Sequence, residues 1–251
     1  MHFSIMIVGE DFDQQLAPFQ ENNMGDCPDE YMEYYVNGTW YKNKEEAVKD
    51  CGEAAETDGY WSNPNSKWDW YVIGGRFQRK FLPKDGVEYN KGSASVFEDP
   101  DPNYAAQIRK GDIDFAKMKE RFFERKRNLW NKVVEVLGKT PEFVVSSEYD
   151  WENKESREEF WNQEDVKKIK ELDDFVWASM TDIDLFSGCQ NVDEFLAKFD
   201  WKDSYRTYGF IRGGEWIDCD WHTDEDYNKA FDKWFDSLPD DVIINIVDCH
   251  D

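Results

Sequence analysis

The order of apolar and polar residues predicts strands near both ends of the chain and helices in between. Short apolar stretches at 5–8 and 242–247 have the length of buried strands. A third stretch, 205–217, is divided by Arg212-Gly213-Gly214-Glu215 and predicts a hairpin. Asn37-Gly38, within an aromatic patch, predicts another hairpin because this dipeptide favours the tight turn between paired strands.

The clearest helix is predicted over 113–137, with Asp112 as its cap and with Gly138 and Pro141 ending it. Apolar residues recur on it at intervals of three and four, which places them on one face toward a core. The residues of this face are Phe115, Met118, Phe122, Leu129, Val133 and Leu137.

The remaining pattern completes an α+β fold. Helices are predicted at 44–55, over much of 154–200 and at 224–238, strands at 67–73, 77–82 and 142–146, and a loop at 83–103. We therefore expect a mixed, mainly antiparallel sheet with packed helices. It would form one compact domain over 1–251, with an acidic helical subregion at 150–200.

The most distinctive stretch is the aromatic strand within 61–77. Along it, Trp68, Trp70 and Val72 alternate with Asp69, Tyr71 and Ile73. Bulky side chains therefore fall on both faces of the strand, and both faces need cover. Gly74 and Gly75 follow, and they lack side chains where the chain must bulge, turn or admit a ligand; Arg76 comes next. The stretch is either a binding site or part of the core.

The charge of the chain narrows its possible partners. Asp and Glu number 55 against 30 Lys and Arg, and the formal net charge of -25 repels DNA, RNA and anionic membranes. Direct DNA binding is therefore not expected. Aromatic residues make up 17% of the chain, and their large apolar area predicts a folded protein. No apolar run has the roughly 18 residues that span a bilayer, and the start lacks the pattern of a signal peptide.

The cysteines indicate the compartment. They are odd in number and contain no CxxC pair, and their positions are Cys27, Cys51, Cys189, Cys219 and Cys249. Such spacing favours reduced thiols over a disulfide framework or structural zinc. We expect a cytoplasmic protein.

One basic helix stands within this acidic chain. Residues 104–139 hold ten Lys or Arg against five Asp or Glu, whereas the remainder holds 20 against 50. A solvated helix face that includes Arg121, Arg125, Lys126 and Arg127 explains the excess best. The alternatives are an anion site on this helix, or a patch that holds the acidic body together.

Several stretches carry a family resemblance. They are the first strand with Gln15-Leu16-Ala17-Pro18-Phe19, the central motif 63–77, the helix start 109–115, and the ending from Leu238-Pro239-Asp240-Asp241 to Val247-Asp248-Cys249-His250. Together they resemble a family of uncharacterised phage and prophage proteins. The resemblance implies a phage or mobile-element origin and a role in the host cytoplasm during infection, and it implies no particular reaction. Phe77 stands where Trp is common in the family, and 140–200 is less typical.

Two patterns with possible chemistry are better explained by structure. Cys249 and His250 adjoin each other, with His2 alongside if the end strands pair, but neighbours on a strand point to opposite faces. We interpret Cys249 as a small buried apolar residue. Residues 218–224 resemble the start of a cation loop.

That loop departs from an EF-hand. His222 takes its fifth position, Thr223 its glycine position, and Lys229 the place of its bidentate glutamate. Capping of the next helix by Thr223 or Asp224 explains the pattern better, and Asp182-Ile183-Asp184 is a weaker case. We expect no metal and no other cofactor.

Two functions follow from these observations, and a third remains open. The leading hypothesis is a non-enzymatic phage accessory protein that binds and inhibits a host protein through an acidic, aromatic surface imitating nucleic acid. The host protein would be a nuclease or another antiviral-defence component. The partner-binding residues would be Glu152, Glu155, Glu158, Glu159, Asp173 and Asp174.

The alternative is a protein that sequesters or processes a nucleotide or a related signalling molecule. Two glycine pairs beside arginine would cradle its phosphate while tryptophan stacks on the base, although tight turns explain both pairs better. The ligand-binding residues would be Trp68, Trp70, Gly74, Gly75, Arg76, Arg212, Gly213 and Gly214. The third possibility is a structural or assembly role.

Overall fold

The chain folds into two compact units in a computed structural model that describes residues 1–95, 98–175, 178–221 and 223–251. Unit 1 consists of Met1–Phe115 and Tyr205–Asp251, and unit 2 consists of Ala116–Ser204. All strands of the described residues lie in unit 1, whereas unit 2 is helical. The fold is α+β, as predicted. The helical subregion expected at 150–200 lies within unit 2.

The main sheet of unit 1 is built around the two end strands. Its strands are β1 (His2–Val8), β5 (Trp70–Ile73), β6 (Gln107–Arg109), β7 (Gly209–Arg212), β8 (Glu215–Asp218) and β9 (Ile243–His250). They follow the order β5-β9-β1-β7-β8, and β6 also pairs with β9. Only the pair β1 and β7 is parallel among these pairings, so the sheet is mixed and mainly antiparallel.

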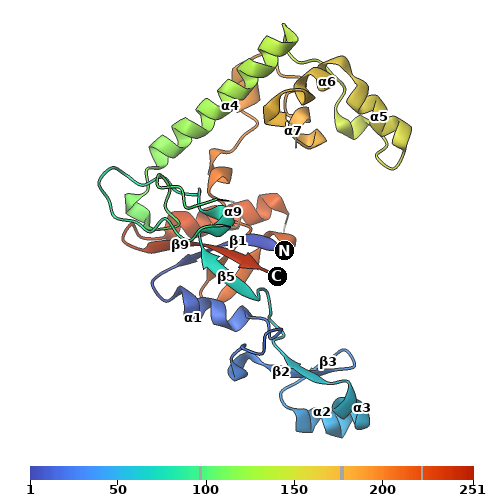
Figure 1. The fold of residues 1–251 in the computed structure, drawn as a ribbon, viewed down its shortest axis with the longest axis vertical. Coiled ribbons are helices and arrows are strands. Elements are labelled where there is room, and N and C mark those ends of the chain that lie inside the picture. The colour runs from blue at the N-terminus through green and yellow to red at the C-terminus, as the bar shows by residue number, and fades with distance from the viewer. Residues whose placement is uncertain (96–97, 176–177, 222) are drawn as a thin grey trace. The chain divides into compact units, whose positions relative to one another are not determined.

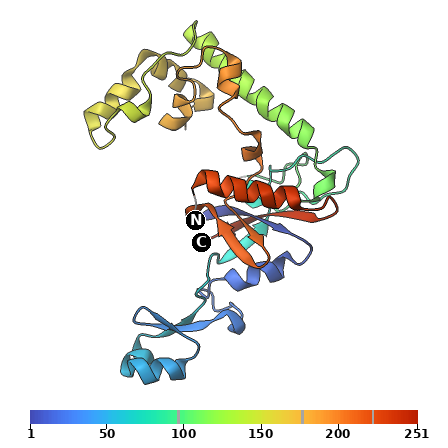
Figure 2. The same cartoon turned by 180° about the vertical axis from the view of Figure 1, so that it is seen from behind.

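Helices cover both faces of this sheet. Figures 1 and 2 show α9 (Asp224–Ser237) along one face and α1 (Phe12–Leu16) along the other. On the α9 side, Phe210 stacks on Trp234 with ring centroids 4.5 Å apart. The other core contains Ile5, Leu16 and Val247. Helix α9 begins as predicted, because the side chain of Thr223 accepts a hydrogen bond from the Asp226 amide.

A second, smaller sheet in unit 1 has the order β3-β2-β4. Its strands are β2 (Glu33–Val36), β3 (Thr39–Tyr41) and β4 (Tyr60–Ser62), and its helices are α2 (Lys44–Cys51) and α3 (Glu53–Thr57). Asn37 and Gly38 have φ values of 50° and 82°, which make the predicted tight turn between β2 and β3. Both helices pack on one face, where Tyr34 and Val36 meet Ala47 and Ala55.

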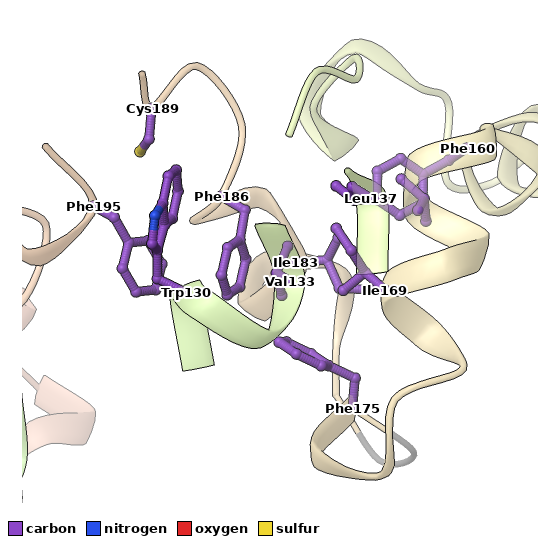
Figure 3. Close-up of a cluster of buried hydrophobic side chains, with 11 residues drawn as sticks. Trp130, Val133, Leu137, Phe160, Ile169, Phe175, Ile183, Phe186, Cys189 and Phe195 are labelled. Atoms are coloured by element: carbon purple, nitrogen blue, oxygen red, sulfur yellow. The ribbon is translucent and has the colours of Figure 1, made fainter. Parts of the chain in front are cut away.

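Unit 2 is organised around the long amphipathic helix. Its helices are α4 (Phe115–Leu137, with Phe115 in unit 1), α5 (Lys154–Asn162), α6 (Glu164–Lys170), α7 (Met180–Asp184) and α8 (Val192–Leu196). Figure 3 shows Trp130 and Val133 of α4 among the buried side chains of Phe186, Phe195 and Ile183. The predicted apolar face omitted Trp130, which is 5% exposed. Helix α4 begins two residues later than predicted and ends at Gly138 as expected.

Two predicted strands do not form. Within 142–146, the backbone amides of Val144 and Ser146 donate to the side chains of Gln163 and Asp184, so side chains take the place of a partner strand. Residues 77–82 do not pair with β5 either. Strand β5 pairs with β9, whereas Phe81 makes only an isolated bridge to Ala105.

Candidate functional site

The aromatic stretch divides between core and surface. Trp68 precedes β5, is 5% exposed, and packs in the same core as Tyr71 and Ile73. Its indole Nε1 donates to the carbonyl oxygen of Leu16 at 3.1 Å. Trp70 is 43% exposed and stacks on His250. The prediction that Trp68 and Trp70 share a face is therefore wrong, because regular strand alternation begins only at Trp70.

Both histidines of the end strands lie beside Trp70. His2 pairs with His250 across β1 and β9, and Trp70 pairs with His250 across β5 and β9, so the three side chains form one row. The ring centroids of His2 and His250 are 5.1 Å apart, and those of Trp70 and His250 are 5.3 Å apart. We call this row, with the carboxylates described next, the histidine centre.

Each histidine of the centre is held by a carboxylate. Nδ1 of His2 lies 2.8 Å from Oδ1 of Asp248, and Nδ1 of His250 lies 2.8 Å from Oδ1 of Asp69. A carboxylate accepts but does not donate, so Nδ1 carries the hydrogen in both rings. Nε2 is left as the nitrogen that exchanges protons, as in acid–base catalysts whose histidine is oriented by aspartate.

The glycine pair that follows the aromatic strand supports this centre. Gly74 and Gly75 have φ values of 81° and 50°, and a Cβ on Gly75 would collide with the carboxylate of Asp248. The backbone amide of Arg76 donates to Oδ2 of Asp248 at 2.8 Å. The turn thus holds a protein carboxylate, and the Arg76 amide is not available to cradle a phosphate.

Further carboxylates surround His250. Burial acts to raise the pKa of Asp69, but hydrogen bonds from His250 and Asn23 outweigh it, and the pKa lies below its usual value. Burial raises the pKa of Glu21, and contact with Asp251 and the charge of Asp69 raise it further. The histidine centre is therefore rich in negative charge.

Among the residues that the structure describes, no protein nucleophile joins the centre. Cys249 is fully buried on the opposite face of β9, as predicted, and burial raises the pKa of its thiol. Within the described part of the chain, no three His, Cys, Asp or Glu side chains are grouped so as to hold a metal ion. The residues can transfer protons and can stack a planar group on the indole.

The second glycine pair lies at the other end of the sheet. Gly213 and Gly214, with φ values of 60° and 83°, form the turn between β7 and β8. Arg212 is exposed and lies 3.5 Å from Glu215. Strand β7 runs parallel to β1 with Phe210 beside Met6, so Arg212 lies beyond Met6, away from His2 and Trp70. The two glycine pairs do not form one ligand site.

A second candidate site is the uncovered face of the small sheet. Tyr35 pairs with Trp40 on β3 and with Tyr60 on β4, so the three rings form a row on the face opposite the buried Tyr34. The ring of Tyr35 lies 4.7 Å from that of Trp40 and 5.4 Å from that of Tyr60. Trp40 is 39% exposed and Tyr60 is 54% exposed. We call Tyr35, Trp40 and Tyr60 the aromatic face.

The chain segment that carries the aromatic face is rich in acidic residues. Residues 21–66 contain eleven Asp or Glu and three Lys, and no ion pair links them. Exposed carboxylates include those of Glu45, Glu46, Glu53 and Glu56, on the helices α2 and α3 that cover the opposite face of the small sheet. Exposed aromatic rings and excess negative charge thus occur together in this part of unit 1.

The predicted partner-binding residues form a different surface. Glu152, Glu155, Glu158, Glu159, Asp173 and Asp174 are all exposed in unit 2. Lys154 lies 3.6 Å from Glu158, and Lys132 lies 2.7 Å from Asp174. These two lysines partly neutralise the carboxylates. The adjacent Phe160 and Phe175 are buried, so neither adds an exposed ring to this surface.

The basic helix has one unusual cation. Arg121, Arg125 and Arg127 are exposed, as a solvated face requires. Lys126 instead lies with Nζ 4.1 Å from the centre of the Phe199 ring, and burial together with the charge of Arg125 lowers its pKa. It lines a hollow of about 350 Å³ with Leu129 and several other unit 2 residues.

The resemblance to a cation loop has another explanation. Asp218 accepts hydrogen bonds from Lys67 and from Nε1 of Trp216, and Thr223 caps α9. His222 lies outside the described residues. Asp182 completes a capping box with Ser179, whereas Asp184 accepts hydrogen bonds from Ser146. These carboxylates serve local structure.

Comparison with known proteins gives no relative. No family model, curated protein or solved structure matches the chain. Within the described residues, no helix combines the length and the hydrophobicity that crossing a bilayer requires.

Sequence reasoning missed parts of both sites. It considered His2 beside His250 but gave neither a role, since the carboxylate partner of each ring is distant in sequence. For the aromatic face, the signal was available: Asn37-Gly38 sets the register that places Trp40 beside Tyr35.

Proposed function

We propose that the protein binds and inhibits a basic host protein through the aromatic face, in a chain segment that is rich in acidic residues. The observation that carries this proposal is the row of Tyr35, Trp40 and Tyr60, in which Trp40 and Tyr60 are exposed, within a segment of strong negative charge. Tyrosine and tryptophan are frequent anchors of protein interfaces, and arginine side chains stack on their rings. A nucleic-acid-binding protein has the complementary basic surface.

The class of partner follows from charge and context. A protein that binds nucleic acid presents arginine and lysine to phosphates, and an acidic surface can occupy the same groove. The resemblance to phage and prophage proteins supports a target in the host cytoplasm. A nuclease or another component of antiviral defence would both bind nucleic acid and be found there. No cofactor is required for this function.

The test compares capture from host lysate by three forms of the protein. The wild type should retain one basic protein in near-equal amount at low salt and release it at high salt. Replacing both Trp40 and Tyr60 with alanine should lower the affinity for the captured protein at least tenfold, because the anchoring rings are lost. Purified target activity should be inhibited by the wild type and not by this variant.

The matched control is a charge reversal in unit 2, Glu155→Lys with Glu159→Lys. We expect it to leave capture nearly unchanged, since these residues are remote in sequence from the aromatic face. If the reversal abolishes capture while the aromatic variant does not, the binding surface lies on unit 2. If neither change nor salt affects capture, the proposal is wrong.

A further inference from the structure

The histidine centre contains proton-transfer groups that partner binding does not use. Among the described residues, Nε2 of His2 and Nε2 of His250 have no hydrogen-bond partner. The side chain of His2 is 16% exposed and that of His250 is 33% exposed, so the rings are partly open to solvent. Two oriented imidazoles with adjacent rings can act together, one accepting a proton while the other donates one.

The two carboxylates are held as positioning groups. Asp248 is 3% exposed in its side chain and accepts the Arg76 amide, while Gly75 leaves room for its carboxylate. Asp69 also contacts the side-chain amide of Asn23, at 3.3 Å. Fixing Nδ1 in this way sets the tautomer and direction of each ring.

We propose that His2 and His250 form a general acid–base pair that cleaves a short ribonucleotide phosphodiester. In the described part of the chain, the centre has no nucleophile of its own: Cys249 faces the other side, and the buried Ser4 accepts a hydrogen bond from the Tyr208 amide. A ribose 2′-hydroxyl supplies an internal nucleophile next to the phosphorus, so an acid and a base suffice.

The ligand class is limited by stacking and by charge. The indole of Trp70 is 43% exposed and offers a surface for a nucleobase. Glu21, Asp69 and Asp251 near His250 repel phosphates, and the whole chain has a formal charge of -25. Repulsion grows with the number of phosphates, so the substrate is limited to about one or two nucleotides' length.

The reaction balances without a co-reactant. One neutral imidazole takes the 2′-hydroxyl proton at Nε2 while the 2′-oxygen forms a bond to phosphorus. The bond from phosphorus to the 5′-oxygen breaks, and that oxygen takes a proton from Nε2 of the other, protonated imidazole. The products are a 2′,3′-cyclic phosphate and a free 5′-hydroxyl. A second cycle with water reverses the proton roles and restores both rings.

The experiment uses the full chain and a fluorogenic ribodinucleotide, with EDTA present. Cleavage should show a bell-shaped dependence on pH, because one ring must be neutral and the other protonated. Asp248 on β9, Asp69 before β5, Glu21 and Asp251 are the titratable groups that face the rings and shape this profile. Asp69→Asn should shift the profile, as a positioning residue would.

His2→Gln and His250→Gln should each lower the cleavage rate by about 10²- to 10⁴-fold with unchanged circular dichroism. Glu225→Gln is the control; this side chain is exposed at the start of α9, and the variant should cleave normally. Cleavage should rise with added salt, since salt screens the repulsion, whereas a contaminating basic ribonuclease would lose activity.

Absence of cleavage by the wild type would overturn the acid–base proposal, as would cleavage that persists in both histidine variants. Either result would leave the partner-binding proposal intact, because Trp40 and Tyr60 belong to the other sheet. If the variant with alanine at Trp40 and Tyr60 loses capture but still cleaves, the acid–base centre acts independently of partner binding. The two proposals therefore fail separately.

Discussion

Gly75 shows how a residue without a side chain determines the geometry of a charged centre. Its φ of 50° is unfavourable for other residues, and a Cβ would occupy the place of the Asp248 carboxylate. We expect Gly75→Ala to lower the free energy of unfolding by about 2–4 kcal/mol, because it adds a steric clash to backbone strain.

The control for this change is Gly86→Ala, measured by the same urea denaturation. Gly86 has a φ of 80°, and a Cβ there would meet no atom within 4 Å. Only backbone strain applies, so the cost should be about 1 kcal/mol. Equal effects of the two substitutions would show that Asp248 yields to the methyl group.

The carboxylates beside His250 should affect stability in opposite directions. The pKa of Asp69 is lower in the folded chain than in the unfolded chain, so its contribution to stability is present above the unfolded pKa and is lost as the pH falls through the folded pKa. Asp69→Asn should therefore destabilise the protein at pH 7 and reduce its loss of stability in acid.

Glu21 has a raised pKa, so its charged form lowers the free energy of unfolding at pH 7, and protonation removes this unfavourable contribution. Glu21→Gln should stabilise the protein at pH 7, and this gain should shrink as the pH falls. Thermal unfolding of both variants between pH 3 and 7 measures the two trends. Parallel pH curves for wild type and both variants would contradict the assignment.

At the scale of elements, local signals were predictive where they were strong. Asn37-Gly38 and Thr223 act through backbone preferences within a few residues, and both the hairpin and the start of α9 are as predicted. The strand predicted at 142–146 failed because Gln163 and Asp184 satisfy its backbone amides, and their positions depend on the packing of unit 2.

Helix α4 offers a sharp test of core packing. Trp130 is 5% exposed, and its ring lies 5.3 Å from that of Phe195, so Trp130→Ala should cost about 3–5 kcal/mol. Val136 on the same helix is 44% exposed, and Val136→Ala should change stability by less than about 0.5 kcal/mol. Urea denaturation, monitored by amide hydrogen exchange of unit 2, measures both changes in stability.

At the scale of the molecule, the fold class was predictable but the sites were only partly so. Apolar stretches at both ends indicated strands, and their residues do form β1 and β9. The neighbours of the two strands are set by packing across more than two hundred residues. The central motif alone therefore could not show that Trp70 has His2 and His250 as its neighbours and that Trp68 lies in the core instead.

The pairing of β1 with β9 also determines the order in which the molecule can form. Residues paired across these strands, such as His2 and His250, are separated by nearly the whole chain, so β1 waits during synthesis until β9 has emerged. Unit 2 is made in the interval and contains its own buried cluster. Folding on the ribosome is therefore expected to begin with the small sheet and then unit 2, with closure of the main sheet as its last and slowest step.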